Sequence, residues 1–274
     1  MKNVFRQLIY GDQVSLTLAD TTEMVNEGIT RHRLSASQAQ LLGSALSAMT
    51  YMGACLKEQT GQVSITLKSQ NGELGVSGDQ PLHIRGYIDG FEGELGFGEG
   101  SLTVVRDDGY SRPFVGTCAL PQNGGIDETM EEYYRVSEQL PTHFKTLIKL
   151  EGGRCAFAGL AVLQPLPFAD EETLRKMPTG KDLEKIVEEL QSLGLERTAK
   201  KYFFTADSAA EWKEAKYQCH CSREYLSRVL ITVGKEELKR IVAEDGAVRA
   251  HCHFCNTDYT FDGEDVENLF KKAD

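Results

Sequence analysis

The amino-acid sequence predicts an α+β protein made of an N-terminal mixed sheet-and-helix domain, a helical linker and a small C-terminal zinc-binding module. Three observations support this division. Segments that alternate apolar and polar residues recur between residues 14 and 163, around one long apolar helix. A stretch rich in Glu and Lys follows residue 169. Four of the seven cysteines then fall in two close pairs between Cys219 and Cys255.

The composition is that of an ordinary globular protein. With 274 residues, of which 41% are hydrophobic and 26% charged, the chain has enough apolar material for about two domains. Residues 1–10 lack the uninterrupted apolar run of a signal peptide, and no segment approaches the ~18 apolar residues that span a membrane. We therefore expect a cytoplasmic protein that does not enter membranes.

The elements of the N-terminal domain follow from apolar periodicity and turn residues. Residues 37–57 place leucine, alanine and methionine at helical spacing with small residues on the other faces, which predicts a long helix buried on more than one side. Its methionines could form an adaptable binding surface, but core packing is the interpretation that we adopt. Further helices are expected over 21–28 and 127–139, and strands over 14–18, 62–68, 82–88, 101–106, 114–120, 143–149 and 155–163.

A linker follows the N-terminal domain. Prolines at positions 165, 167 and 178 mark the boundary, after which we expect residues 170–216 to be helical. Apolar residues between Leu183 and Leu193 form the stripe of an amphipathic helix that ends at Gly194. That stripe must pack on the N-terminal sheet, a second copy or another protein chain, and the sequence does not choose among them. The expected domains are thus 1–169 (N-terminal core domain), 170–216 (helical linker) and 217–274 (C-terminal zinc-binding module).

The two cysteine pairs predict a zinc site. Cys219 and Cys221 form a C-x-C pair, and Cys252 and Cys255 form a C-x-x-C pair. Zinc favours thiolate ligands, and structural zinc sites are closed by four protein groups in a tetrahedron. The four sulfurs are therefore the expected ligand set for Zn²⁺.

The same residues allow other interpretations. His220, His251 and His253 each adjoin a cysteine and could bind zinc, but a side chain next to a ligand on a tight loop cannot easily reach the same metal. The four cysteines could instead be core residues, which their polar neighbours argue against. The single cysteines at positions 55, 118 and 155 are expected to be buried small hydrophobic residues.

The charge pattern argues against two classes of function. The formal net charge is −11, and the stretch from Cys219 to Asp274 holds eight Lys/Arg against eleven Asp/Glu, so nucleic acid is not an expected partner. The glycines at 93, 96, 98 and 100 lack the strand-loop-helix context and the Lys-Ser/Thr of a phosphate loop. No ATP site is therefore expected.

Thiolates that bind zinc are also nucleophiles that oxidants convert to disulfides through sulfenic acid. Each cysteine of the two pairs has a resolving partner nearby in the sequence. Zinc contributes on the order of 10–16 kcal/mol to a small zinc module, which exceeds the total stability of many domains, about 5–15 kcal/mol. Loss of the metal on oxidation should unfold the C-terminal module and loosen the linker, which is a redox switch.

At this point the sequence resembles a known family. Cys219-x-Cys221-Ser-Arg-Glu and Cys252-x-x-Cys255, with Ala243-Glu-Asp-Gly246 before the second pair and Tyr259-x-Phe261 after it, are similar to the heat-shock protein 33 (33 kDa chaperonin) family of redox-regulated holdase chaperones. The segment Ser137-Glu-Gln-Leu-Pro-Thr142 and the helix 37–57 leading into Val63–Leu67 also match. The similarity extends over almost the whole chain.

The resemblance implies a function for each part. In the reduced state Cys219, Cys221, Cys252 and Cys255 would hold Zn²⁺. Oxidation would release zinc, form the disulfides Cys219–Cys221 and Cys252–Cys255, unfold the linker and give an active homodimer that binds unfolding proteins without ATP. The protein would not be an enzyme. Residues 204–217 depart from the pattern, because they are longer and more helical than the resemblance leads us to expect.

Two rival functions remain at this level. A thiol oxidoreductase would use the C-x-x-C pair, but it needs a low-pKa cysteine at a helix N-terminus in a βαβ context, whereas Cys252 follows a predicted strand. A constitutive zinc-ribbon adaptor would keep its metal under oxidant. It would also lose its function in the reduced state when the cysteines are replaced.

Overall fold

The computed structural model describes residues 2–93, 96–122, 124–203 and 210–271. Contacts between residues divide the chain into two compact units, 1–218 and 219–274, each of which is described by itself. The three-part division at residues 169 and 216 stays a prediction. Within the part of the chain that the structure describes, no helix combines the length and the apolar character needed to cross a membrane.

The first unit contains two sheets. The five-stranded sheet has the order β10-β1-β2-β9-β8 and is antiparallel throughout. Its strands are β1 (Val4–Ile9), β2 (Val14–Asp20), β8 (His143–Glu151), β9 (Arg154–Pro165) and β10 (Glu211–Lys213). The six-stranded sheet has the order β11-β5-β4-β3-β6-β7, in which β11 alone pairs in parallel. Its strands are β3 (Gln62–Ser69), β4 (Gly72–Asp79), β5 (His83–Gly90), β6 (Gly100–Asp107), β7 (Phe114–Ala119) and β11 (Lys216–Tyr217).

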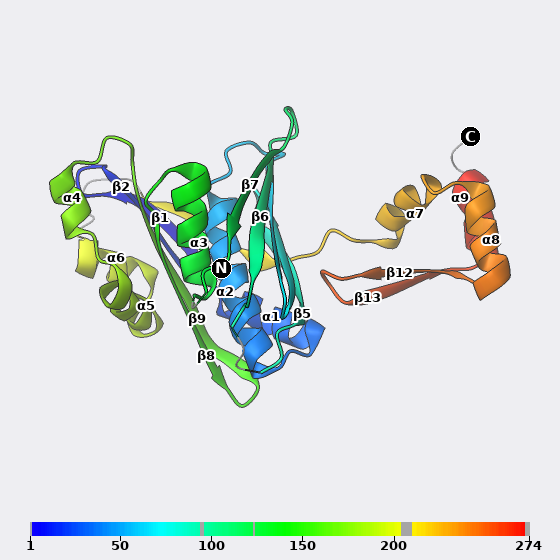
Figure 1. Cartoon of the computed structure of the whole chain (residues 1–274), viewed down its shortest axis with the longest axis horizontal. Coiled ribbons are helices and arrows are strands. Elements are labelled where there is room, and N and C mark those ends of the chain that lie inside the picture. The colour runs from blue at the N-terminus through cyan, green and yellow to red at the C-terminus, as the bar shows by residue number, and fades with distance from the viewer. Residues whose placement is uncertain (1, 94–95, 123, 204–209, 272–274) are drawn as a thin grey trace. The chain divides into compact units, whose positions relative to one another are not determined.

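The helix α2 (Ala36–Ala54) packs against strands of both sheets and forms the centre of the largest core cluster (Figure 1). It begins at a capping box, in which the Ser35 side chain accepts from the Gln38 backbone and the Gln38 side chain accepts from the Ser35 backbone. Met49 and Met52 are buried, which confirms the core interpretation of these methionines. The helices α1 (Thr22–His32) and α3 (Ile126–Tyr133), with the π-helical turn η1 (Tyr134–Glu138), also contact α2 or the strands beside it.

The linker helices cover the other face of the five-stranded sheet (Figure 1). They are α4 (Glu171–Lys176), α5 (Gly180–Leu193) and α6 (Leu195–Phe203). The apolar stripe of α5 packs on β8 and β9, with Leu183, Ile186, Val187 and Leu190 buried. Successive residues of β9 therefore face different clusters: Leu160 and Val162 pack with α2, whereas Ala161 and Leu163 pack with the linker helices. The sequence did not choose among three packing partners for this stripe. In the structure the stripe packs on the chain's own five-stranded sheet.

Some sequence expectations were wrong. The strand β4 was not predicted, because it contains glycines, which are unfavourable within strands. At Gly75 the glycine is required, since a Cβ there would lie 2.3 Å from the Tyr87 ring. The helix expected up to residue 216 is absent over 210–216, where β10 and β11 form instead. Their helix-forming Ala, Glu and Lys residues yield to pairing with two sheet edges. The expectation for 204–209 lies outside the described residues.

A buried carboxylate in the first unit gives a pH-dependent prediction. Asp127 accepts hydrogen bonds from the backbone N–H of Thr146 at 3.0 Å and from its hydroxyl at 2.7 Å, and Lys145 Nζ lies 3.6 Å away. Burial nevertheless raises the pKa of Asp127 above its ordinary value of 3.8, against these hydrogen bonds and the lysine. The folded protein thus binds the Asp127 proton more tightly than the unfolded chain does. The stability that this proton contributes is therefore lost as pH rises through the raised pKa.

We expect the free energy of unfolding of the wild type, relative to Asp127→Asn, to decrease as pH rises from below 3.8 towards neutrality. Urea unfolding in steps from acid to neutral pH measures this difference. Asp108→Asn is the matched control. Hydrogen bonds from the Ser111 and Tyr110 backbone lower the pKa of the exposed Asp108, so the free energy of unfolding of the wild type relative to Asp108→Asn should increase with pH. A difference for Asp127 that is flat with pH, or that rises, contradicts the prediction.

The second unit is small. It contains α7 (Arg223–Ile231), α8 (Lys235–Asp245), α9 (Gly263–Lys271) and the hairpin of β12 (Val248–Cys252) with β13 (Thr257–Phe261). The strand predicted before Cys252 is β12. The core cluster has four buried residues, Leu238, Val248, Phe261 and Val266, among the residues described. So small a core is marginal without a further stabilising element.

Candidate metal centre

Local structure brings the two cysteine pairs to one place. Cys219 and Cys221 precede α7, whose N-cap Ser222 accepts from the Tyr225 backbone N–H at 3.1 Å. Cys252 ends β12, and Cys255 lies in the turn that leads to β13. That turn closes with a bond from the Cys255 N–H to the Cys252 carbonyl at 3.3 Å and with Asn256 in the left-handed region. The start of a helix and the tip of a hairpin thus present two thiols each.

The four sulfur atoms lie within 4.8 Å of one another. Cys219 Sγ is 3.7 Å from Cys252 Sγ, and Cys221 Sγ is 3.0 Å from Cys255 Sγ. Zn–S bonds of ~2.3 Å in a tetrahedron place sulfurs ~3.8 Å apart. Four soft ligands at this spacing fit a zinc ion, so the cluster could hold a metal. Both of these sulfur–sulfur contacts join a sulfur of one pair to a sulfur of the other.

Two hydroxyl groups contact the cluster, and the sequence did not single out either for this role. The Tyr259 hydroxyl lies 3.3 Å from Cys221 Sγ, and Cys255 Sγ lies 3.3 Å from Thr257 Oγ1. Both residues are on β13, and their reach depends on the hairpin register that pairs Cys252 with Thr257 and Ala250 with Tyr259. The Tyr259 hydroxyl can donate to a Cys221 thiolate and stabilise its charge, whereas the Thr257 hydroxyl donates to the Cys255 carbonyl and accepts from the Cys255 thiol. Such partners orient metal ligands.

The thiols differ in acidity. Burial disfavours ionisation of Cys221, but hydrogen bonds from Tyr259 and the neighbouring thiols outweigh it and lower its pKa to about 7. Burial raises the pKa of Cys255 to about 11, and burial likewise raises the pKa of Cys219 well above its usual range. Ionisation of one thiol therefore disfavours ionisation of the others, and a divalent cation would offset that repulsion.

The histidines beside the cysteines were expected to point away from the metal. His251 Nδ1 lies 2.7 Å from the Asp258 carboxylate, and its ring stacks edge-on against His253 at 5.0 Å between centroids. Within the described residues, the group of four convergent ligand atoms at this place is made of sulfurs alone. Of the single cysteines, Cys118 and Cys155 are buried as expected, whereas Cys55 is half-buried.

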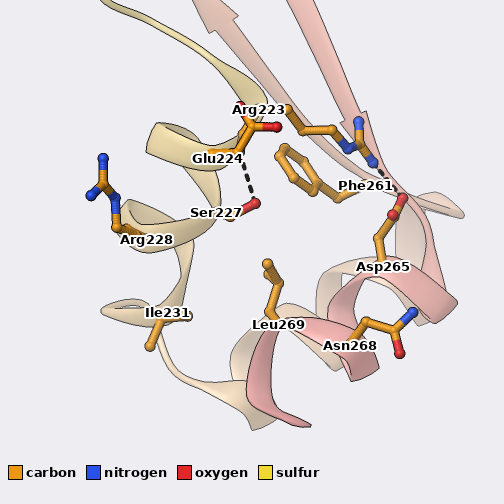
Figure 2. A pocket seen from close by; sticks show the side chains of 9 residues that line it. All are labelled: Arg223, Glu224, Ser227, Arg228, Ile231, Phe261, Asp265, Asn268 and Leu269. Atoms are coloured by element: carbon orange, nitrogen blue, oxygen red, sulfur yellow. Dashed lines mark hydrogen bonds and ion pairs between the residues drawn. The ribbon is translucent and has the colours of Figure 1, made fainter. Parts of the chain in front are cut away.

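Arg223 connects the metal centre to the rest of the unit. Its guanidinium lies 4.3 Å from the centroid of the Phe261 ring, donates to the Thr260 carbonyl at 2.8 Å and pairs with Asp265 at 2.6 Å. Figure 2 shows Arg223, Phe261 and Asp265 at one end of a cavity of about 640 Å³ between α7 and α9, with Leu269 pointing into it. The helix that follows Cys221 is thus held to β13 and α9 through one side chain.

Comparisons with known proteins give matches that cover nearly the whole chain. The sequence profile of the Hsp33 protein family matches residues 3–262. The chain is 32% identical to the 33 kDa chaperonin of Bacillus mycoides (strain KBAB4), over 97% of this chain and 98% of that protein. It is 33% identical to the 33 kDa chaperonin of Bacillus cereus (strain G9842), over 97% of each. The crystal structure of the 33 kDa chaperonin from Thermotoga maritima superposes with a TM-score of 0.83 at 26% identity, covering 100% of this chain and 99% of that one.

Proposed function

Because the chain belongs to the Hsp33 chaperone family, we propose that it is a redox-regulated, ATP-independent holdase that binds unfolding proteins under oxidative stress. The observation that carries the proposal is the convergence of four thiols from two separate pairs in a unit with four buried apolar core residues among those described. Such a unit depends on its metal centre for stability. The same thiols are the groups that an oxidant attacks.

In the reduced state Cys219, Cys221, Cys252 and Cys255 would hold Zn²⁺, which when bound supplies a positive charge that keeps the four thiolates ionised. These residues then tie the start of α7 to the β12–β13 hairpin. Tyr259 and Thr257 orient two of the sulfurs through their hydroxyls. The reduced protein is inactive in this proposal because the unit and the linker stay folded.

Oxidation changes the ligands themselves. Each pair of cysteine sulfurs would lose two electrons to one molecule of hydrogen peroxide, which takes up two protons and leaves as two waters while one S–S bond forms. The proposed bonds are Cys219–Cys221 and Cys252–Cys255. A disulfide sulfur no longer binds zinc as a thiolate, so the closed ligand set is lost and the unit loses its main support.

The consequences of oxidation follow from the fold. Unfolding after residue 218 would act directly on the linker residues that precede it, expose apolar surface to unfolding client proteins and allow a homodimer to form. The protein would act in the cytoplasm, without nucleic acid, membrane or ATP, and would not be an enzyme. Against a thiol oxidoreductase, Cys252 ends a strand rather than beginning a helix.

Zinc release and chaperone activity should appear together. Reduced and peroxide-treated protein are compared at raised temperature, with a chromogenic chelator for zinc and light scattering of an unfolding test protein recorded in parallel. We expect zinc to leave as suppression of aggregation appears. A variant in which Cys55, Cys118 and Cys155 are replaced by serine serves as the control and should respond in the same way.

Two outcomes would change the proposal. If zinc stays bound and suppression is equal in both states, the protein is a constitutive adaptor. If peptide mapping of the oxidised protein finds Cys219–Cys252 and Cys221–Cys255 bonds, which join the sulfurs that lie 3.7 and 3.0 Å apart, the within-pair disulfides are wrong although the switch stands.

A further inference from the structure

The segment from Glu211 to Gln218, which we call the strap, completes one edge of each sheet in the first unit. Its first part, β10, pairs antiparallel with Val4–Arg6 of β1, and its second part, β11, pairs in parallel with His83 and Ile84 of β5. Without the strap, β1 and β5 would be edge strands with unpaired backbone groups. An edge of this kind is a template for another extended chain.

The strap satisfies successive backbone groups along β5. The Lys216 N–H donates to the Leu82 carbonyl at 3.1 Å, and the Gln218 N–H donates to the Ile84 carbonyl at 2.8 Å. The Tyr217 hydroxyl then donates to the Gly86 carbonyl at 2.8 Å and accepts from the Gly86 N–H at 3.4 Å. A side-chain hydroxyl thus continues the strand pairing by one position. These contacts recognise an extended backbone and one phenol.

At β1 the contacts have the same character. The Trp212 ring packs edge-on against Phe5, with 5.1 Å between centroids. Where the strap crosses from one sheet to the other, the Asn3 side chain accepts from the Ala215 N–H at 2.8 Å and donates to the Ala215 carbonyl at 3.1 Å. An amide that bonds both the N–H and the carbonyl of one residue recognises the main chain rather than a particular side chain. Two further contacts are charged: Arg6 Nη1 lies 3.5 Å from Glu211 Oε2, and Lys213 Nζ donates to the Ala54 carbonyl at 3.1 Å. The other contacts described for the two edges are to extended backbone and to aromatic rings of their occupant.

The strap is held by short strands and by two half-buried aromatic side chains, Trp212 and Tyr217. Its strands have three and two residues, and Ala215 is its one fully buried residue, whereas α5 buries four apolar side chains. Backbone pairing of such short strands contributes little net free energy. Gln218 is followed directly by Cys219 in the sequence. A change of state at the cysteines would therefore act on the strap without any intervening residue.

We propose that the edges of β1 and β5 form a docking site for extended segments of unfolded polypeptides, and that the strap is the internal occupant of this site. The inference rests on the proposed holdase function and assigns its client surface. When the strap leaves, Asn3, Leu82, Ile84 and Gly86 present the backbone groups, and Phe5 presents a ring, to a segment that carries aromatic residues. Every extended chain offers the backbone groups, which suits a holdase with many clients.

The test uses a fluorescein-labelled peptide with the sequence of residues 210–218, the full-length reduced protein and its Trp212→Ala/Tyr217→Ala variant. The double substitution weakens the strap and leaves both edges intact. Because apparent affinity scales with the fraction of open sites, we expect the peptide to bind the variant at least ~10-fold more tightly than the reduced wild type in fluorescence anisotropy. A peptide with Lys216→Pro lacks the N–H that bonds Leu82 and should bind several-fold more weakly.

The unlabelled peptide should also restore aggregation of a test protein that the oxidised wild type holds. Failure of the peptide to bind the double variant, with thermal unfolding of the first unit unchanged, overturns the docking site. So does a variant that forms a dimer in sedimentation and excludes the peptide, because a second copy then occupies the edges. If the double variant does not fold, Trp212→Ala, at a half-buried position, gives the same comparison.

Failures of the docking site and of the proposed function are distinguishable. If the oxidised protein suppresses aggregation but the peptide neither binds nor competes, the docking site is wrong and the redox-chaperone proposal stands. If the peptide binds the double variant but oxidation gives no chaperone activity, the docking site stands and the redox-chaperone proposal is wrong.

Discussion

Replacement of Cys221 by serine is expected to abolish zinc retention and to unfold residues 219–274 while the first unit stays folded. The substitution removes one of four convergent sulfurs, and it also leaves the Tyr259 hydroxyl without its thiol partner. Loss of a hydrogen-bond partner of a metal ligand alone costs ~10–100-fold in affinity, so loss of the ligand should cost more. Zinc content after dialysis against a mild chelator, together with protease sensitivity of the C-terminal unit, measures the effect.

Cys55→Ser is the matched control, because it makes the same chemical change in the first unit, at the half-buried C-cap of α2. Its zinc content and protease pattern should equal those of the wild type. A Cys221→Ser protein that keeps a full complement of zinc under the same dialysis would remove Cys221 from the ligand set. The three remaining sulfurs would then need a different fourth ligand.

The candidate site could be located from sequence because its chemistry lies in residue types and local spacing. C-x-C and C-x-x-C each place two thiols on one turn, and those thiols lead to the same ligand set in any fold that brings the turns together. The contacts of Tyr259 and Thr257 could not be predicted in the same way. Their hydroxyls reach the sulfurs only through the register of the β12–β13 hairpin, and a shift by one residue would turn both side chains to the other face.

The fold was predictable where the apolar pattern is strong. The buried helix α2 and the alternating strand β3 have clear periods, and the structure contains both. The strand β4 was missed because its glycines follow the demands of neighbouring rings, such as Tyr87 beside Gly75, rather than strand propensity. The strap was expected to be helical because its residues favour helix locally. Its strands exist because β1 and β5 offer unpaired backbone groups, which are a property of the whole sheet.

Phe261→Ala is expected to have the second large effect, because it removes the most fully buried aromatic ring of the C-terminal unit, which is 1% exposed. Truncation of a buried Phe to Ala costs about 3–5 kcal/mol, and the Arg223 guanidinium loses the ring above which it lies. In a unit with so few buried apolar residues, we expect folding and metal binding to be coupled. A loss of ~3 kcal/mol in folding then appears as a ~100-fold weaker apparent zinc affinity, although every sulfur is retained.

Competition with a chelator of known affinity measures this change, and Val233→Ala is the matched control, because Val233 lies in the same unit and is 47% exposed. The control should bind zinc as tightly as the wild type. If Phe261→Ala also binds zinc with wild-type affinity, the metal centre is stable without the small core, and zinc loss need not unfold the unit. The redox switch would then require a different connection between the four sulfurs and the linker.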